Sequence, residues 1–285
     1  MMARRVTAYV FMTVALLLAR PAWAPYHRMV IDQVFFGTPA ATDAQFVQLR
    51  TLASGQIFVN NQSVRAEHGD GSSAGTFGVF AKNLTSTPAA GVRILMGTKR
   101  AEDLFCLAMD QIAGGALTAP DGRICFGLFT GPVTCLAYGD YAGDNTGFGH
   151  PAMAPDLGKA LVRQNLSGHC AGGTNADNPC NADADCRSGS CAYDDNASDF
   201  AAGDPLPQNT TQQAGAIDGT PGDPDGIGTV RPEGIEHEVA VLFEADRRCD
   251  LTDPSRRGAD ANLDTRIDAA DVTATVQIVA AAGPA

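Results

Sequence analysis

Residues 29–36 read Met29-Val-Ile-Asp-Gln-Val-Phe-Phe36 and are followed at once by Gly37-Thr-Pro39. Valine, isoleucine and phenylalanine favour extended backbone, and glycine and proline favour a turn after it. The next stretch, Gln45-Phe-Val-Gln-Leu-Arg-Thr-Leu52, places Val47 and Leu49 on one face. A period of two is typical of a strand with one face buried. These two stretches therefore predict the first two strands of a sheet.

Short stretches of the same kind recur along the chain, separated by turns rich in glycine and proline. The further expected strands are Ile57–Val59, Val64–Glu67, Gly75–Phe80, Val92–Met96, Ile124–Phe129, Val133–Tyr138 and Lys159–Asn165. Thr98 can cap a short helix that runs through Leu104, with Glu102 and Asp103 in its first turns. Many short strands at near-regular spacing predict a β-sandwich.

Composition allows a folded core and argues against one class of partner. The chain has 285 residues, of which 45% are hydrophobic and 18% are charged, with 31 glycines and 16 prolines. This glycine and proline content indicates many turns rather than long helices. The formal net charge of -12 offers no basic surface to neutralise phosphates, so nucleic acid is not expected as a partner.

The N-terminus reads as a secretory signal peptide over residues 1–24. It has a charged start at Arg4-Arg5, an apolar run from Val6 to Ala19 and an A-x-A cleavage site at Ala22-Trp-Ala24. The run is too short to span a bilayer, and no later stretch is long and apolar enough to do so. We therefore expect a secreted, extracellular protein without a transmembrane segment in the mature chain, with the cell surface or the periplasm as alternatives. The next residue, Pro25, disfavours cleavage and leaves an uncleaved anchor open.

Eight cysteines follow this segment, and an even number behind a signal peptide favours disulfides. Cys125 and Cys135 fall in two neighbouring predicted strands, so we expect a bridge across that hairpin. Four cysteines lie within residues 170–191, where almost nothing apolar can be buried, so disulfides are expected to hold this segment together. Their three pairings stay open, and zinc is the alternative, although a C-x2-C spacing is missing there. The remaining two, Cys106 and Cys249, could pair by elimination.

Several of these stretches together carry a family resemblance. Val30-Ile-Asp-Gln-Val-Phe-Phe-Gly37 and Gln45-Phe-Val-Gln-Leu-Arg50 resemble the first and second strands of lamin-tail-type domains of secreted bacterial proteins, with Gln48 where that family often has Glu. Three later stretches resemble later elements of the family. They are Ile94-Leu-Met-Gly-Thr98, Leu161-Val-Arg163 and Asn196-Ala-Ser-Asp-Phe200, the last followed by Pro205 and Pro207. The resemblance implies an immunoglobulin-like β-sandwich over residues 25–209, with 170–191 as a Cys-rich insertion. Such domains are regarded as interaction modules without catalytic residues.

A calcium-loop spacing lies near the C-terminus, in Asp260-Ala-Asn-Leu-Asp-Thr-Arg-Ile-Asp-Ala-Ala-Asp271. Side-chain oxygens occupy the first, third, fifth, ninth and twelfth places, and the seventh place gives a backbone carbonyl, as in an EF-hand loop. Carboxylates this close repel one another unless a hard cation lies between them. Thr265 stands at the sixth place, where glycine usually makes the turn. The expected ligands of one Ca²⁺ ion are Asp260, Asn262, Asp264, Arg266 through its carbonyl, Asp268 and Asp271.

An earlier stretch, Asp223 to Gly234, aligns with this loop, and Val230 matches Ile267 at the eighth place. The apolar residues that follow each loop keep the same spacing, which places each set on one helical face. These sets are Ile235, Val239 and Leu242 after the first loop and Val272, Val276 and Val279 after the second. The first loop has Ile227 and Gly234 at its fifth and twelfth places, so we expect it to be degenerate and kept for packing.

The two loop-helix units resemble a type I dockerin, an EF-hand-like repeat pair, over residues 222–285. Residues 210–221 read as a linker before it. The resemblance implies a small α-helical module that docks to a cohesin-like domain or a cell-surface protein. A calcium-braced cap on the chain is the alternative for the same module.

A catalytic motif is matched formally by Gly71-Ser-Ser-Ala-Gly75, which fits G-x-S-x-G. A nucleophile elbow needs a strand before it and a helix after it. Here a predicted strand follows, so we interpret the motif as a hairpin turn.

The sequence as a whole predicts a secreted, calcium-binding protein that is not an enzyme and that acts by binding or as a structural component. The alternative is a secreted hydrolase of polysaccharide or ester that carries the dockerin-like module. It would need two convergent carboxylates, or a Ser-His pair near Ser73, in the β-domain.

Overall fold

A computed structural model of the chain describes a β-rich body and parts of the C-terminal segment. The described residues are 28–85, 88–128, 131–146, 148–165, 168–171, 174, 179–180, 187, 190–192, 196–215, 235, 239, 260–263 and 269–282. The predicted signal peptide lies outside these residues. Among the described helices, none combines the length and the apolar character needed to cross a membrane.

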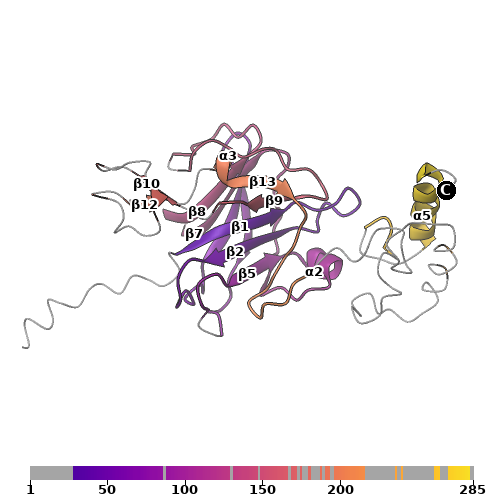
Figure 1. The fold of residues 1–285 in the computed structure, drawn as a ribbon, viewed down its shortest axis with the longest axis horizontal. Helices are drawn as coiled ribbons and strands as arrows, with labels where there is room; N and C mark the ends of the chain where they lie inside the picture. The colour runs from indigo at the N-terminus through magenta and orange to yellow at the C-terminus, as the bar shows by residue number, and fades with distance from the viewer. Residues whose placement is uncertain are drawn as a thin grey trace, which may run out of the picture.

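The chain folds mainly into β-strands, as the sequence predicts, and two sheets make up most of the body (Figure 1). The larger sheet has the order β13-β9-β1-β2-β5-β6, and the smaller has the order β4-β3-β7-β8. The strands of the larger sheet are β1 (Met29–Phe35), β2 (Phe46–Thr51), β5 (Arg93–Gly97), β6 (Gln111–Ile112), β9 (Ala160–Arg163) and β13 (Phe200–Gly203). The strands of the smaller sheet are β3 (Ser63–His68), β4 (Ser73–Val79), β7 (Gly122–Leu128) and β8 (Gly131–Tyr138). All pairings within both sheets are antiparallel except that of β5 with β6.

One predicted strand is wrong. Residues 57–59 form no strand, because their amides bond within the segment instead of to a neighbouring strand. The amide of Ile57 donates to the Gly55 carbonyl and that of Val59 donates to the Ile57 carbonyl, both at 2.9 Å. Bonds that span two residues close γ-turns, which end strand pairing.

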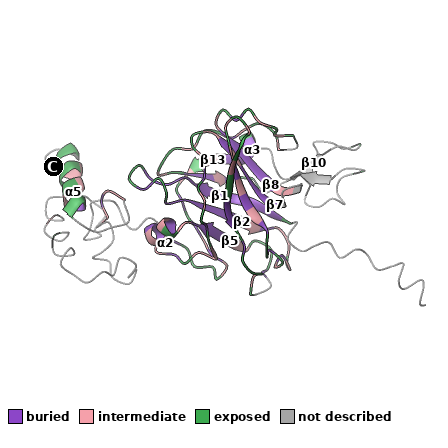
Figure 2. Ribbon diagram, turned by 180° about the vertical axis from the view of Figure 1, so that it is seen from behind, coloured by how far each residue is buried: buried purple, intermediate pink, exposed green. Residues whose placement is uncertain are grey.

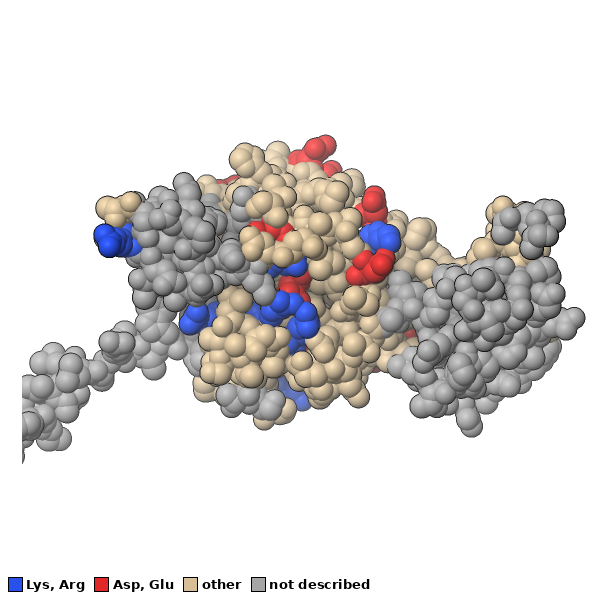
Figure 3. Space-filling model, viewed as in Figure 1, with Lys and Arg blue, Asp and Glu red and all other residues tan. Residues whose placement is uncertain are grey.

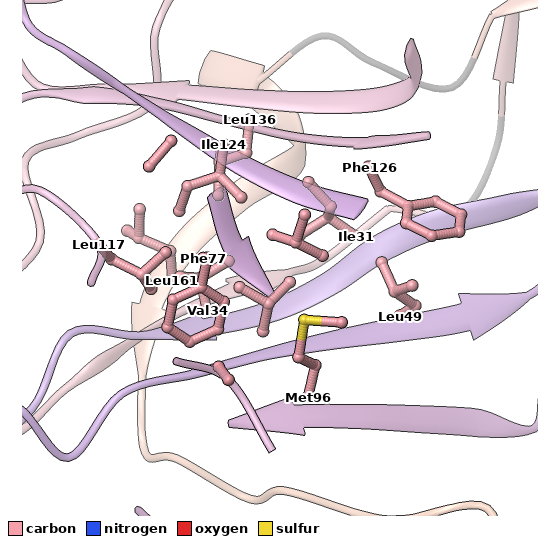
Figure 4. Packing of buried hydrophobic residues seen from close by; sticks show 14 of the residues in the cluster. Ile31, Val34, Leu49, Phe77, Met96, Leu117, Ile124, Phe126, Leu136 and Leu161 are labelled. Atoms are coloured by element: carbon pink, nitrogen blue, oxygen red, sulfur yellow. The ribbon is translucent and has the colours of Figure 1, made fainter. Parts of the chain in front are cut away.

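The main core lies between the two sheets (Figures 2 and 4). The β7 strand contributes the alternate residues Ile124 and Phe126. The β1 strand contributes Ile31 and Val34, which face the same side because the strand bulges between Ile31 and Gln33. The rings of Phe80 and Phe126 meet edge to face at 6.1 Å. At about 25 cal/mol per Å² of buried apolar surface, this interior is the main favourable contribution to folding.

A second cluster covers part of the outer face of the larger sheet. Helix α2 (Lys99–Phe105) begins at its predicted cap, because the Thr98 side chain accepts a hydrogen bond from the Ala101 amide. The helix packs Phe105 edge to face against Phe35 at 5.2 Å and against Phe46 at 5.3 Å. These rings, with Ala41, Ala44, Leu95, Ala101, Leu104, Leu107 and Ala160, form the outer cluster.

The rest of the outer face is polar and carries a buried acid. The β1 strand bulges between Ile31 and Gln33, which places Asp32 outward beneath two arginines. Asp32 lies 2.9 Å from the Nε of both Arg50 and Arg93. The Arg93 contact is a hydrogen bond, whereas Arg50 bonds the carboxylate through its terminal nitrogen at 3.3 Å. Basic side chains gather over β1, β2 and β5 in Figure 3, on a protein whose formal net charge is -12.

The predicted hairpin disulfide is present, since Cys125 and Cys135 lie opposite each other on β7 and β8 and are bonded. Cys106, at the C-cap of α2, is also disulfide-bonded; its expected partner Cys249 lies outside the described residues. The Cys-rich insertion contains a small three-stranded sheet made of β10 (Gly168–Ala171), β11 (Pro179–Cys180) and β12 (Ser190–Ala192). The side chains of its cysteines lie outside the described residues, so their pairing stays a prediction.

The predicted linker at 210–221 begins too early. Thr210 is fixed to the β-rich body, because its amide donates to the Asp110 carboxylate at 2.9 Å and its hydroxyl bonds the same group. The Gly215 amide in turn donates to the Pro207 carbonyl at 2.9 Å. Residues 210–215 therefore belong to the β-domain, and residues 216–221 lie outside the described part of the chain.

Candidate metal centre

The structure describes three of the six predicted calcium ligands. These are Asp260, Asn262 and Asp271. Asp264, Arg266 and Asp268 lie outside the described residues, so their positions stay predictions. Within the described ranges, which leave out these three residues, no three His, Cys, Asp or Glu side chains converge as a metal site.

The loop begins with a tight turn. The Leu263 amide donates to the Asp260 carbonyl at 3.3 Å. Leu263 has a φ of 56°, in the left-handed region that a non-glycine residue seldom adopts. The chain thus turns at the fourth place of the predicted loop, directly after Asn262.

The far end of the loop folds back onto this turn. Helix α5 (Ala269–Ala282) carries Asp271 in its first turn, where the helix dipole favours a negative charge. The backbone amide of Asn262 donates a hydrogen bond to Oδ1 of Asp271 at 3.3 Å. The twelfth place of the loop is therefore brought next to the third.

The chemistry of these residues fits a hard cation. Asp271 is wholly buried, with 0% relative exposure, and a buried carboxylate is costly unless positive charge or hydrogen bonds compensate it. The three described side chains offer carboxylate and amide oxygens, which are the donors that Ca²⁺ prefers. If bound, Ca²⁺ would be held by Asp260, Asn262 and Asp271 together with the three predicted ligands, and it would supply the charge that offsets their repulsion.

The helix that follows the loop differs from its prediction in the face that it buries. Its fully buried positions are Asp271 and Thr275, one turn apart, whereas Val276 is 46% exposed. The buried stripe thus lies one residue before the predicted valine stripe, because Asp271 faces the turn at residues 260–263 and accepts a hydrogen bond from it. In the predicted first unit, Ile235 and Val239 are helical and Val239 is exposed; the loop from Asp223 to Gly234 lies outside the described residues.

The serine motif lies in a hairpin turn, as predicted. It joins β3 to β4, and Gly71 in the turn has a φ of 84°. The Ser72 hydroxyl donates to Asp70 at 2.6 Å, and this hydrogen bond lowers the pKa of Asp70. Ser73 opens a strand rather than a helix, so the local geometry differs from that of a nucleophile elbow.

Sequence reasoning missed one residue beside the loop. Thr38, in the turn after β1, donates its hydroxyl proton to the Leu263 carbonyl at 3.1 Å. The two residues are 225 positions apart, so no local pattern could pair them. The sequence signal for such a contact was the apolar side chain of Leu263, which stands between predicted ligands in an otherwise polar loop.

Comparison of the chain with protein-family models gives no match. Comparison with curated proteins likewise gives no match.

Proposed function

We propose that the chain is a secreted, calcium-binding protein that acts by binding or as a structural component, without catalysis. In this proposal an immunoglobulin-like β-sandwich of the lamin-tail type is the interaction domain. A C-terminal dockerin-like module binds one Ca²⁺ ion through the ligands from Asp260 to Asp271.

The observation that carries the proposal is the contact between Asn262 and Asp271. The 3.3 Å hydrogen bond from the backbone amide of Asn262 to the Asp271 carboxylate brings together two predicted ligand places that are nine residues apart. A solvated acidic turn before a helix would leave the carboxylate in water. The full burial of Asp271 instead supports a loop that closes around a cation.

The packing of the β-domain supports a binding role. The space between the sheets is filled by apolar side chains such as Val34, Leu49 and Leu161 (Figure 4). Recognition would therefore use loops and outer faces, as immunoglobulin-like sandwiches do. The arginines around Asp32 on the outer face are partly exposed and are suited to polar contacts with a partner.

The dockerin resemblance supplies the proposed partner of the C-terminal module, which is a cohesin-like domain or a cell-surface protein. Val276 on α5 is 46% exposed, so the helix retains an apolar side chain for such a contact. Secretion rests on the predicted signal peptide and on the disulfides, which persist in oxidising compartments.

The test of this proposal is the metal content of the exported full chain after dialysis against millimolar calcium. We expect one Ca²⁺ per chain in the unmodified protein and none in the double variant Asp260→Ala/Asp264→Ala. Asp204→Ala, which removes a carboxylate that is 77% exposed in the β-domain, should retain the ion. An unmodified chain free of calcium would refute the proposal, and N-terminal sequencing of the same sample would test signal cleavage.

A further inference from the structure

The turn between β1 and β2 holds the predicted calcium loop against the β-domain. Thr38 in this turn is fully buried and is fixed on both sides. Its amide donates to the Ala41 carbonyl at 3.1 Å, and the Ala41 amide donates to the Thr38 hydroxyl oxygen at 2.9 Å. A hydroxyl has one proton to donate. Because the oxygen already accepts from Ala41, the proton is directed to the Leu263 carbonyl at 3.1 Å.

Leu263 is held by its side chain as well as by its carbonyl. The side chain packs against the outer cluster that contains Phe35, Phe46 and Phe105. The neighbouring Ala261 is buried, with 7% exposure. A left-handed backbone is unfavourable for a residue other than glycine, so Leu263 keeps its φ of 56° because such contacts outweigh that strain.

The position of Leu263 gives this contact a consequence for metal binding. It lies between Asn262 and Asp264, the ligands at the third and fifth places of the loop. Fixing its carbonyl and its side chain restrains the turn that carries Asn262. A loop held in its binding shape before the ion arrives loses less conformational entropy on binding, and therefore binds more tightly.

We propose that Thr38 and Leu263 are positioning residues for the calcium loop, so that the β-domain is part of the calcium-binding unit. This inference rests on the proposed function of the loop. Coupling between two sites is reciprocal. Calcium binding should therefore stabilise the turn at residues 37–45 by the same factor by which that turn strengthens calcium binding.

The test uses the full chain with its disulfides intact and measures calcium affinity by titration calorimetry. Thr38→Val keeps the shape of the side chain but removes the hydroxyl that donates to the Leu263 carbonyl and accepts from the Ala41 amide. Leu263→Ala removes the apolar contact. We expect each variant to bind calcium about 5- to 20-fold more weakly, within the usual range of coupling between sites. The matched controls are Thr273→Val, on an exposed position of α5, and Leu206→Ala, at a leucine that is 63% exposed; both should stay within about twofold of the unmodified chain.

Amide hydrogen exchange of residues 37–45, with and without calcium, gives a second readout that a merely structural role would not move. Calcium should slow exchange there in the unmodified chain and much less in Leu263→Ala. The inference would be overturned, and the proposed function left intact, if both variants bind calcium as tightly as the unmodified chain and calcium does not change the amide exchange rate at residues 37–45. Failure of the unmodified chain to bind calcium at all would overturn both. A variant that fails to fold would be recognised by the loss of β-sheet circular dichroism, and the exchange experiment on the unmodified chain would then decide.

Discussion

Arg50 and Arg93 lie directly opposite each other on β2 and β5, although like charges across a strand pair repel. The Asp32 carboxylate lies within 2.9 Å of a nitrogen of each guanidinium and is itself 6% exposed. The Gln48 amide also donates to this carboxylate at 2.9 Å. One buried acid thus joins three strands of the larger sheet.

Loss of this acid should destabilise the sheet strongly. Asp32→Ala leaves two arginines facing each other without a counter-charge, and breaking a buried ion pair in this way costs about 3–5 kcal/mol. Asp204→Ala is the matched control, because its pair with Lys159 is mostly exposed and such pairs contribute about 0–1 kcal/mol. Urea unfolding measures both values. Adding Arg93→Met to Asp32→Ala should recover part of the loss, and equal costs for the two single variants would contradict this account.

The stability of the β-domain should depend on pH through Asp110. Burial raises the pKa of this carboxyl above its ordinary value of 3.8, despite hydrogen bonds from the amides of Leu95 and Thr210. The folded state then holds the proton more tightly than the unfolded state does. The stabilisation from this group is therefore present below pH 3.8 and is lost as the pH rises through the higher folded pKa.

Unfolding free energies of the unmodified chain and Asp110→Asn, measured over a pH series, test this sign. The unmodified chain should lose stability relative to the variant as the pH rises across that window. The unfolding free energy of Asp204→Asn, a change at an exposed carboxylate, should vary with pH in the same way as that of the unmodified chain. If the difference in unfolding free energy between the unmodified chain and Asp110→Asn stays constant with pH, or changes in the opposite direction, the raised pKa of Asp110 is contradicted.

The disulfide between Cys125 and Cys135 should stabilise the smaller sheet by a modest amount. Its sequence separation is 10, and a loop of this length corresponds to about 3 kcal/mol of lost chain entropy in the unfolded state. The double variant Cys125→Ala/Cys135→Ala should therefore unfold at lower urea concentration under oxidising conditions. An unchanged midpoint would contradict this prediction.

Local features of this fold could be predicted from sequence, and long-range ones could not. The β1 and β2 strands follow from their apolar patterns, the helix start follows from Thr98, and the bridge at Cys125 follows from two adjacent strand patterns. The strand order could not be predicted, because β1 lies between β2 and β9, which come from distant parts of the chain. The strand predicted at Ile57–Val59 is wrong, because three apolar residues are too few to show a strand period and therefore cannot exclude consecutive γ-turns.

The candidate metal centre divides in the same way. The ligand spacing from Asp260 to Asp271 was readable because it is local. The predicted buried face of α5 is wrong by one residue, because the apolar spacing of its valines does not show that the carboxylate of Asp271 is buried. The support from Thr38 depends on tertiary contact alone. Likewise, the partners of Asp32 lie on other strands, although a charged residue inside an apolar strand was a visible signal.

The most direct test is calcium titration calorimetry of the full chain and Asp271→Asn, with Asp204→Asn as the control. Asp271 is the predicted ligand that is buried and that accepts a hydrogen bond from the Asn262 backbone amide, and asparagine keeps the size of the side chain while removing its charge. We predict one calcium per unmodified chain, retained in Asp204→Asn and weakened at least tenfold in Asp271→Asn, since a lost buried charge costs more than about 1.4 kcal/mol. Equal calcium binding by the unmodified chain and Asp271→Asn, or no binding by either at millimolar calcium, would contradict the account.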